Sequence, residues 1–319
     1  MKKSALLGAV VLGLSGCATQ GPVAEVRLVS QAFENLSGAS QPLLDELALA
    51  ERAQGRRVAL ARAGANETKA PGAAVDTANA RVCPGILLIA LPESAGVPPV
   101  QNDFCPEDSP YWSELDDPPG TRAFRRALAA VGDYTTLLMM LAENRNIDEA
   151  MGQLQVLAGN LGTALAMVGG GGVDATLGTA LEAFKPLLQI AAQRANSEEL
   201  KRLVKQESPK VDKLVEALRA SARPMFRTLT GQSRRLLSRD GADPAQIKVE
   251  AARVEGYRVA VSNYVMLLDQ YGRLLGDLVA AYEQPHPGSL ASLAQRSARL
   301  SAQAEAWRRS LAALHSGLQ

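Results

Sequence analysis

The stretch VEGYRVAVSNYVMLLDQYGRLLGDLVAAYEQPHPGSLASLAQRSARLSAQAEAWRRSLAALHSGL, residues 254–318, decides the fold class of this chain. Apolar and tyrosine side chains recur in its first half at steps of three and four, as Val254, Tyr257, Val261, Tyr264, Leu268, Tyr271, Leu275, Leu278 and Tyr282. After a Pro/Gly turn at 285–288 the spacing resumes, as Leu290, Leu293, Ser297, Leu300, Ala304, Trp307, Leu311, Leu314 and Leu318. One apolar stripe on each of two helices, joined by a tight turn, predicts an antiparallel hairpin from Ala245 to Gln319 with coiled-coil-like packing.

Helical spacing extends upstream to Thr121, which follows two prolines and a glycine and is placed to cap the first helix of this region. Breaks or kinks are expected at Asn146 with Glu149, the glycine run 169–172, Pro186, Pro224 and Asp243-Pro244. Residues 121–319 are therefore expected to form a helical bundle. The fold class is predicted to be all-α, an elongated multi-helix bundle.

The N-terminal part of the chain divides into helices and an irregular segment. Residues 23–33 and 41–63 are predicted to form two helices, because their apolar residues keep helical spacing. Residues 64–120 lose this spacing and are rich in Pro, Gly, Asp and Asn, so an irregular insertion is expected there. The one apolar run of the insertion, at 86–89, suits either a strand or a buried extended plug.

The first seventeen residues have the pattern of a secretory signal. Two lysines precede an apolar core from Ala5 to Leu14, which is too short to span a bilayer as a helix. Leu14-Ser15-Gly16-Cys17 follows at once and resembles the lipobox of bacterial lipoproteins. The resemblance implies removal of residues 1–16, acylation of Cys17 and a lipidated tether over 17–22. Because Ala18 rather than Asp follows the cysteine, it also implies lipid anchoring in the outer membrane, facing the periplasm.

Two cysteines remain after such processing, Cys83 and Cys105, both inside the irregular insertion. Because the periplasm is oxidising, an even pair in an exported chain is expected to form a disulfide. A bridge of this span contributes about 3 kcal/mol in the chain-entropy description. The alternative is a thiol nucleophile or a metal pair, and either would need a histidine nearby in the sequence, where there is none.

Few residues are candidates for chemistry. The two histidines, His286 and His315, would lie near opposite ends of the last helix and so cannot share one site. The acid pairs Glu107-Asp108, Asp116-Asp117 and Glu198-Glu199 are expected to be solvated or capping groups. The glycine run 169–172 lacks the lysine of a nucleotide-binding loop. No catalytic residue, metal ligand or cofactor is therefore predicted.

Charge and aromatic content restrict the partners. Lysine and arginine number 34 against 33 acidic residues, which does not favour nucleic acid. The arginine doublets Arg125-Arg126, Arg234-Arg235 and Arg308-Arg309 are expected on solvated helix faces, although one of them also suits an anionic cell-wall or headgroup partner. The tyrosines at 257, 264, 271 and 282 are expected to pack at the margin of the bundle, with a recognition stripe as the alternative.

These observations favour a non-enzymatic lipoprotein that binds or scaffolds through helical faces. Its partners would be the lipid bilayer, through acylated Cys17, and an envelope protein. One alternative is membrane insertion or permeation by a 150–190 hairpin, because residues 150–173 carry no formal charge and small residues recur there every four positions. Another is a cell-wall enzyme with a cleft between the insertion and the bundle. The sequence leaves the oligomeric state open.

Overall fold

The computed structural model describes residues 23–67, 88–89, 100–101, 104–143, 145–168, 197–283 and 288–316. The long helices of this part are α1 (Val23–Glu67), α3 (Pro119–Ala142), α4 (Ile147–Val168), α7 (Ser197–Ala220), α10 (Pro244–Glu283) and α11 (Ser289–Ser316). The short elements are β1 (Leu88–Ile89), β2 (Val100–Gln101), the 3-10 turn η3 (Pro106–Asp108), α2 (Ser109–Trp112), α8 (Ala222–Leu229) and α9 (Gly231–Leu237). The all-α fold class is therefore confirmed for the described residues, with one antiparallel pairing of β1 with β2.

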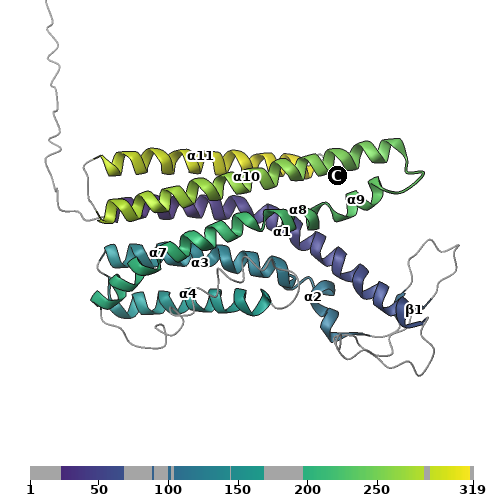
Figure 1. Ribbon diagram of the computed structural model, residues 1–319, viewed down its shortest axis with the longest axis horizontal. Helices are drawn as coiled ribbons and strands as arrows, with labels where there is room; N and C mark the ends of the chain where they lie inside the picture. The colour runs from purple at the N-terminus through teal and green to yellow at the C-terminus, as the bar shows by residue number, and fades with distance from the viewer. Residues whose placement is uncertain are drawn as a thin grey trace, which may run out of the picture.

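Helix α1 is the element around which the others are arranged (Figure 1). Its N-terminal half packs against α10 and α11 on one side and α3 on the other, while α8 and α9 meet it further along. Helix α7 contacts both α10 and α3, and α4 packs against α3. The long helices run roughly along one axis, which gives the molecule its elongated shape (Figure 1).

The core is continuous through these helices. Its largest fully buried side chains are Tyr134, Tyr264, Tyr271, Leu36, Leu43, Leu44, Leu128, Leu137, Leu154 and Leu157. Burial of each such side chain contributes about 1.5–3 kcal/mol. The bundle is therefore stabilised mainly by apolar packing along α3, α10 and the N-terminal half of α1.

Helix α1 is one helix of 45 residues, so the prediction of two separate N-terminal helices is wrong. Pro42 lies inside it and has no N–H to donate to the carbonyl one turn earlier. Two side-chain donors serve carbonyls in that region: Ser40 Oγ donates to Leu36 O at 2.8 Å and Gln41 Nε2 donates to Ser37 O at 3.1 Å. The buried residues on either side of Pro42 hold the helix continuous through packing.

The predicted C-terminal hairpin is confirmed, with a third helix against it. The residues of the α11 stripe also face α1, where Ser297 Oγ donates to Leu28 O at 2.7 Å and Asn35 Nδ2 donates to Ser301 Oγ at 2.9 Å. This contact explains a serine in an otherwise apolar stripe. A regular heptad pattern identifies a packed face, but it does not say how many helices share that face.

The expectation that the tyrosines lie at the bundle margin is wrong for Tyr264 and Tyr271, which are fully buried. The Tyr271 ring lies 5.0 Å from that of Phe33 on α1, and the Tyr264 ring lies 6.1 Å from that of Trp307 on α11. A third tyrosine of α10, Tyr257, donates its hydroxyl to a carboxylate, and this contact is described below. These aromatic pairs join α10 to its two neighbours.

Helix α3 begins at Pro119 rather than at Thr121, and the cap comes from another helix. The Glu51 carboxylate on α1 accepts the backbone N–H groups of Gly120 and Thr121, each at 2.8 Å, and the Thr121 hydroxyl at 2.9 Å. Pro118 occupies the cap position without a side-chain hydrogen bond. A carboxylate at a helix N-terminus also interacts favourably with the helix dipole. The prediction of Thr121 as the cap is therefore wrong.

Other predicted breaks correspond to observed helix ends. Asn146 caps α4, accepting the Asp148 N–H at 3.1 Å, and Asp243 caps α10, accepting the Ala245 N–H at 3.2 Å. The expected kink at Pro224 is instead a break between α7 and α8 at Ser221, since a proline disfavours helical hydrogen bonding in the preceding turn. A second break at Thr230 separates α8 from α9.

Candidate functional site, an arginine-lined groove

A cleft of about 290 Å³ lies between the middle of α1, the α8–α9 segment and the N-terminal half of α10. We call it the inner cleft. It is lined by Glu46, Leu49, Ala50, Ala53, Arg57, Thr228, Leu229, Gln232, Ser233, Arg253 and Tyr257.

Four polar side chains of the inner cleft, Glu46, Tyr257, Ser233 and Arg253, have hydrogen-bond partners in the protein. The Tyr257 hydroxyl donates to Glu46 Oε2 at 2.8 Å, and burial together with the Glu46 carboxylate raises the pKa of Tyr257. Ser233 Oγ donates to Glu250 Oε2 at 2.6 Å, and Arg253 donates to both oxygens of the same carboxylate at 3.0 and 3.2 Å. Because Ser233 is only 1% exposed, this serine and carboxylate hold α9 against α10 rather than face a substrate.

A second, wider cleft of about 860 Å³ continues along α1 and shares Arg57 with the inner cleft. We call it the arginine groove. It is lined by Gln54, Arg57, Val58 and Ala61 of α1 together with Arg227, Gly231, Arg234, Arg235, Leu237 and Ser238 of the α8–α9 segment. Its lining contains four arginines and no acidic side chain among the residues that the structure describes.

The sequence places these arginines together through two stretches that lack acids. Residues 52–66 of α1 contain four arginines and no Asp or Glu, and residues 222–239 contain five arginines and no Asp or Glu. The break at Thr230 turns α9 relative to α8, so that Arg227 at the end of α8 and Arg234 on α9 line the same groove. Thr230 itself is buried, and its hydroxyl donates to Phe226 O at 2.7 Å, which fixes this break.

The four arginines of the groove have no acidic partner within 4 Å in the described part of the chain, unlike most arginines of the bundle. Burial and the positive charge of Arg235 lower the pKa of Arg57. Arg57 and Arg235 line the same groove, so their like charges repel each other. The groove is thus a concave surface with uncompensated positive charge.

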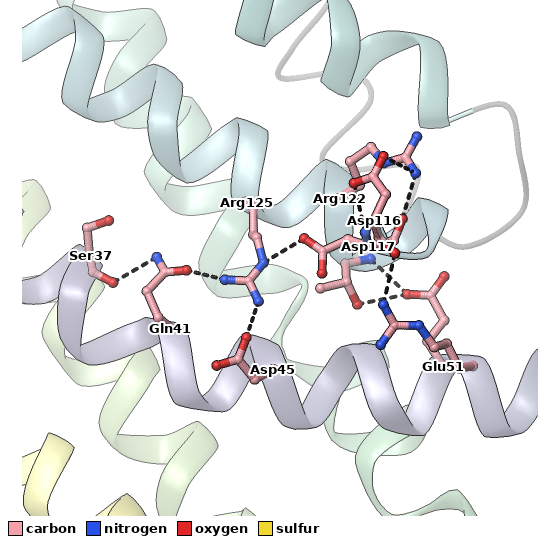
Figure 2. A network of polar contacts seen from close by, with 10 residues as sticks. Ser37, Gln41, Asp45, Glu51, Asp116, Asp117, Arg122 and Arg125 are labelled. Atoms are coloured by element: carbon pink, nitrogen blue, oxygen red, sulfur yellow. Dashed lines mark hydrogen bonds and ion pairs between the residues drawn. The ribbon is translucent and has the colours of Figure 1, made fainter. Parts of the chain in front are cut away.

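The acid pair Asp116-Asp117 and Arg125 lie elsewhere, in a polar network between α1 and α3 (Figure 2). Arg125 binds Gln41 and Asp45 of α1, and its Nε lies 2.7 Å from Asp117 Oδ2. Arg122 lies 2.7 Å from Asp116 Oδ2. Both carboxylates are therefore bound by arginines of α3, and Arg125 in turn joins α3 to α1, as Glu51 does.

The other residues singled out in the sequence do not line the groove. Arg126 donates to Asn160 on α4, and Arg308 pairs with Glu305 on α11, so neither doublet forms a site with the groove. Asp108 is buried at the end of η3 and Glu107 is exposed beside it. The Glu198-Glu199 pair falls in the first turn of α7, and His315 in the last turn of α11.

Several predictions concern residues outside the described part of the chain. Cys17 and its lipobox, Cys83, His286, the glycine run 169–172 and Pro186 all lie there. Cys105 is buried at the start of η3, and its bridge to Cys83 stays a prediction. The described residues contain no group of three or more His, Cys, Asp or Glu side chains placed to hold a metal ion.

Of the 150–190 segment, the structure describes the part within α4. Ala150, Leu154, Leu157 and Asn160 are buried there, and Asn160 donates to Asp133 Oδ2 on α3 at 2.6 Å. Burial raises the pKa of Asp133, an effect that the hydrogen bonds from Asn160 and Gln153 oppose. None of the described helices has both the length and the apolar character that crossing a bilayer requires.

The chain matches no known family, no curated protein and no solved structure. The site must therefore be judged on its own geometry. Sequence reasoning named Arg234-Arg235 but missed Arg57 and Arg227. The sequence does contain a signal for them, because residues 52–66 and 222–239 both carry arginines and lack Asp and Glu. That signal indicates a shared site only when the two stretches are known to lie side by side.

Proposed function

We propose that this protein is a lipoprotein of the outer membrane, anchored through acylated Cys17 and facing the periplasm, and that it acts as a non-enzymatic binding module. The anchor is supported by the sequence Leu14-Ser15-Gly16-Cys17 after a short apolar core. The binding role rests on one observation, the arginine groove, where four cationic side chains line an open surface without an acidic partner among the described residues. The helical faces around the groove would present it to an envelope partner.

The rest of the described bundle is consistent with a rigid support for this groove. α1 passes from the core directly into the groove wall as one continuous helix. The α9 part of the wall is held to α10 by the hydrogen bond from Ser233 to the buried Glu250, a carboxylate that Arg253 of α10 also binds. A site on such elements keeps its geometry better than a site on a loop.

The anchor is tested by expressing the full chain in a Gram-negative host beside a Cys17→Ser variant. Intact-mass analysis should show the parent protein starting at Cys17 with diacylglyceryl and acyl additions, and fractionation should place it in the outer membrane. The variant should lose both properties. An unmodified Cys17 with residues 1–16 retained would refute the anchor.

The binding role is tested by crosslinking and capture from envelope extracts, comparing the parent protein with Arg57→Glu/Arg235→Glu. A partner recovered with the parent and lost with the double variant supports binding through the groove. Arg273→Glu is the matched control, because Arg273 is also an exposed arginine but lies on α10 in an ion pair with Asp269. Equal capture by all three proteins would contradict a role for the groove.

A further inference from the structure

We propose that the arginine groove binds a ligand carrying two or more phosphate groups. This inference deepens the binding role proposed above and rests on that role, but it does not depend on the lipid anchor. It is carried by the placement of four guanidinium groups on three elements around one cavity: Arg57 on α1, Arg227 on α8, and Arg234 with Arg235 on α9.

The first step is the contrast with other arginines of the same chain. Arg122, Arg125, Arg219, Arg253 and Arg273 each lie within 4 Å of an aspartate or glutamate oxygen. The four arginines of the groove have no such partner within the described residues. Arg223, Arg239 and Arg299 also lack an acidic partner within the described residues, but they do not line this groove. The four groove arginines share one space, where an anionic ligand would offset their mutual repulsion.

The second step concerns the chemistry of the lining. Besides the arginines, the polar side chains of the groove are Gln54 and Ser238, and the remainder are Gly231, Val58, Ala61 and Leu237. Such a lining is rich in hydrogen-bond donors and poor in acceptors. It suits a ligand made mainly of acceptor oxygens, and a guanidinium binds phosphate oxygens in a planar, two-pronged arrangement. A sugar or an amine, which must also donate, finds few acceptors here.

The third step is size. A groove of about 860 Å³ has room for a ligand with several anionic groups. One phosphate would engage one or two of the arginines, whereas two linked phosphates would reach arginines on both α1 and α9. Two sources supply this chemistry: a soluble diphosphate compound and the phosphorylated headgroup of a lipid. The concave shape of the site is compatible with either.

The test uses the full chain with Cys17→Ser, so that no acyl chain of the protein contributes to binding. Pyrophosphate and inorganic phosphate are titrated by calorimetry at low and moderate salt. Pyrophosphate should bind more tightly than phosphate, and its affinity should fall as salt rises. Arg57→Gln and Arg235→Gln should each weaken pyrophosphate binding about tenfold, since each removes a charge-assisted hydrogen bond to the ligand.

Arg273→Gln is the matched control and should bind pyrophosphate like the parent. It removes an exposed arginine of α10 that lies sixteen residues beyond Tyr257, the last α10 residue lining the inner cleft. Circular dichroism of each variant checks that the helices remain. Vesicles with and without cardiolipin, whose headgroup carries two phosphates, separate the two sources. Co-sedimentation that pyrophosphate reverses supports a headgroup, while pyrophosphate binding without co-sedimentation supports a soluble ligand.

Two results would overturn the proposal: no binding of pyrophosphate or of anionic vesicles, or binding that both groove substitutions leave unchanged. Neither result affects the anchor, which is measured separately by mass and fractionation. Conversely, an unacylated Cys17 would remove the anchor and leave pyrophosphate binding by the groove intact. A partner captured through the groove without pyrophosphate binding would keep the binding role and reject the phosphate ligand.

Discussion

The two halves of α1 belong to one unbroken helix but have different surroundings. Residues 23–48 bury apolar side chains on almost every turn, including Val26, Val29, Leu36, Leu43 and Leu44. In the described residues from 49 to 61, by contrast, only Gly55 and Ala59 are buried, and Leu49 and Val58 are more than half exposed. The first half belongs to the core and the second half forms the wall of two clefts.

The difference shows how one element can supply both stability and a binding surface. The core half packs against the long helices of the bundle. The distal half instead reaches α3 through Glu51 at its start, borders α10 across the inner cleft and lies beside the short elements α2, α8 and α9. The two halves also differ in charge, because the distal half carries the arginines Arg52, Arg56, Arg57 and Arg62. Of these, Arg52 and Arg56 donate to carbonyls of the 111–116 segment, so that Arg57 alone is placed in the groove by the described contacts.

The largest effect on the free energy of unfolding is expected when leucine is replaced by alanine in the core half of α1 and compared with the same substitution in the distal half. Leu43→Ala removes a fully buried side chain and should lower the free energy of unfolding by about 2–5 kcal/mol. Leu49→Ala, six residues later on the same helix, removes a side chain that is 57% exposed and should change it by about 0.5 kcal/mol or less. Urea denaturation followed by circular dichroism measures both. Equal losses would show that the two halves do not differ in burial.

Gly55 tests a tight contact of the distal half with α2. A Cβ added at Gly55 would lie 2.3 Å from the ring of Tyr111, so Gly55→Ala should destabilise the protein by about 1–3 kcal/mol and loosen α2 from α1. The matched control is Gly38→Ala on the same helix. Nothing lies within 4 Å of a Cβ there, and removing a helical glycine should stabilise by about 0.5–1 kcal/mol.

The readouts for this pair are urea denaturation and limited proteolysis of the 104–118 segment. Gly55→Ala should speed cleavage in that segment, and Gly38→Ala should not. If Gly55→Ala were as stable as the control and equally resistant to proteolysis, the close packing of Tyr111 on α1 would be contradicted.

A smaller effect is expected at the junction of the two halves, where Glu51 caps α3. Glu51→Ala leaves the N–H groups of Gly120 and Thr121 without their acceptor and should cost about 1–2 kcal/mol in the free energy of unfolding. Glu34→Ala is the control, because Glu34 is an exposed glutamate of the core half. Hydrogen exchange should rise at Gly120 and Thr121 only in the first variant. Unchanged exchange there would mean that other groups cap α3.

The smallest effect on stability is expected from Arg235→Gln in the groove. Arg235 repels Arg57 and has no acidic partner in the described residues, so its loss should leave the free energy of unfolding within about 0.5 kcal/mol of the parent. The variant should be the slightly more stable of the two at low salt. This difference should vanish at about 1 M salt, where the screening length is about 3 Å. A clear destabilisation would assign Arg235 a structural role instead.

Much of the bundle could be predicted because its information is local. The stripes of α10 and α11, and the caps at Asn146 and Asp243, each depend on residues a few positions apart. Prediction was wrong where a distant segment intervened. Packing carries α1 through Pro42, and Glu51 rather than Thr121 caps α3, because buried surface and a carboxylate from another helix outweigh the local preferences.

The sequence by itself determined that this chain is built of amphipathic helices, because the period of its apolar residues is a property of neighbours along the chain. Only the tertiary structure decided which polar groups remain open. Arg57 and Arg235 are far apart in sequence, and no pattern in either stretch shows that they line one cavity. Charge acts through space and not along the chain, so the groove exists only once α1, α8 and α9 are packed together.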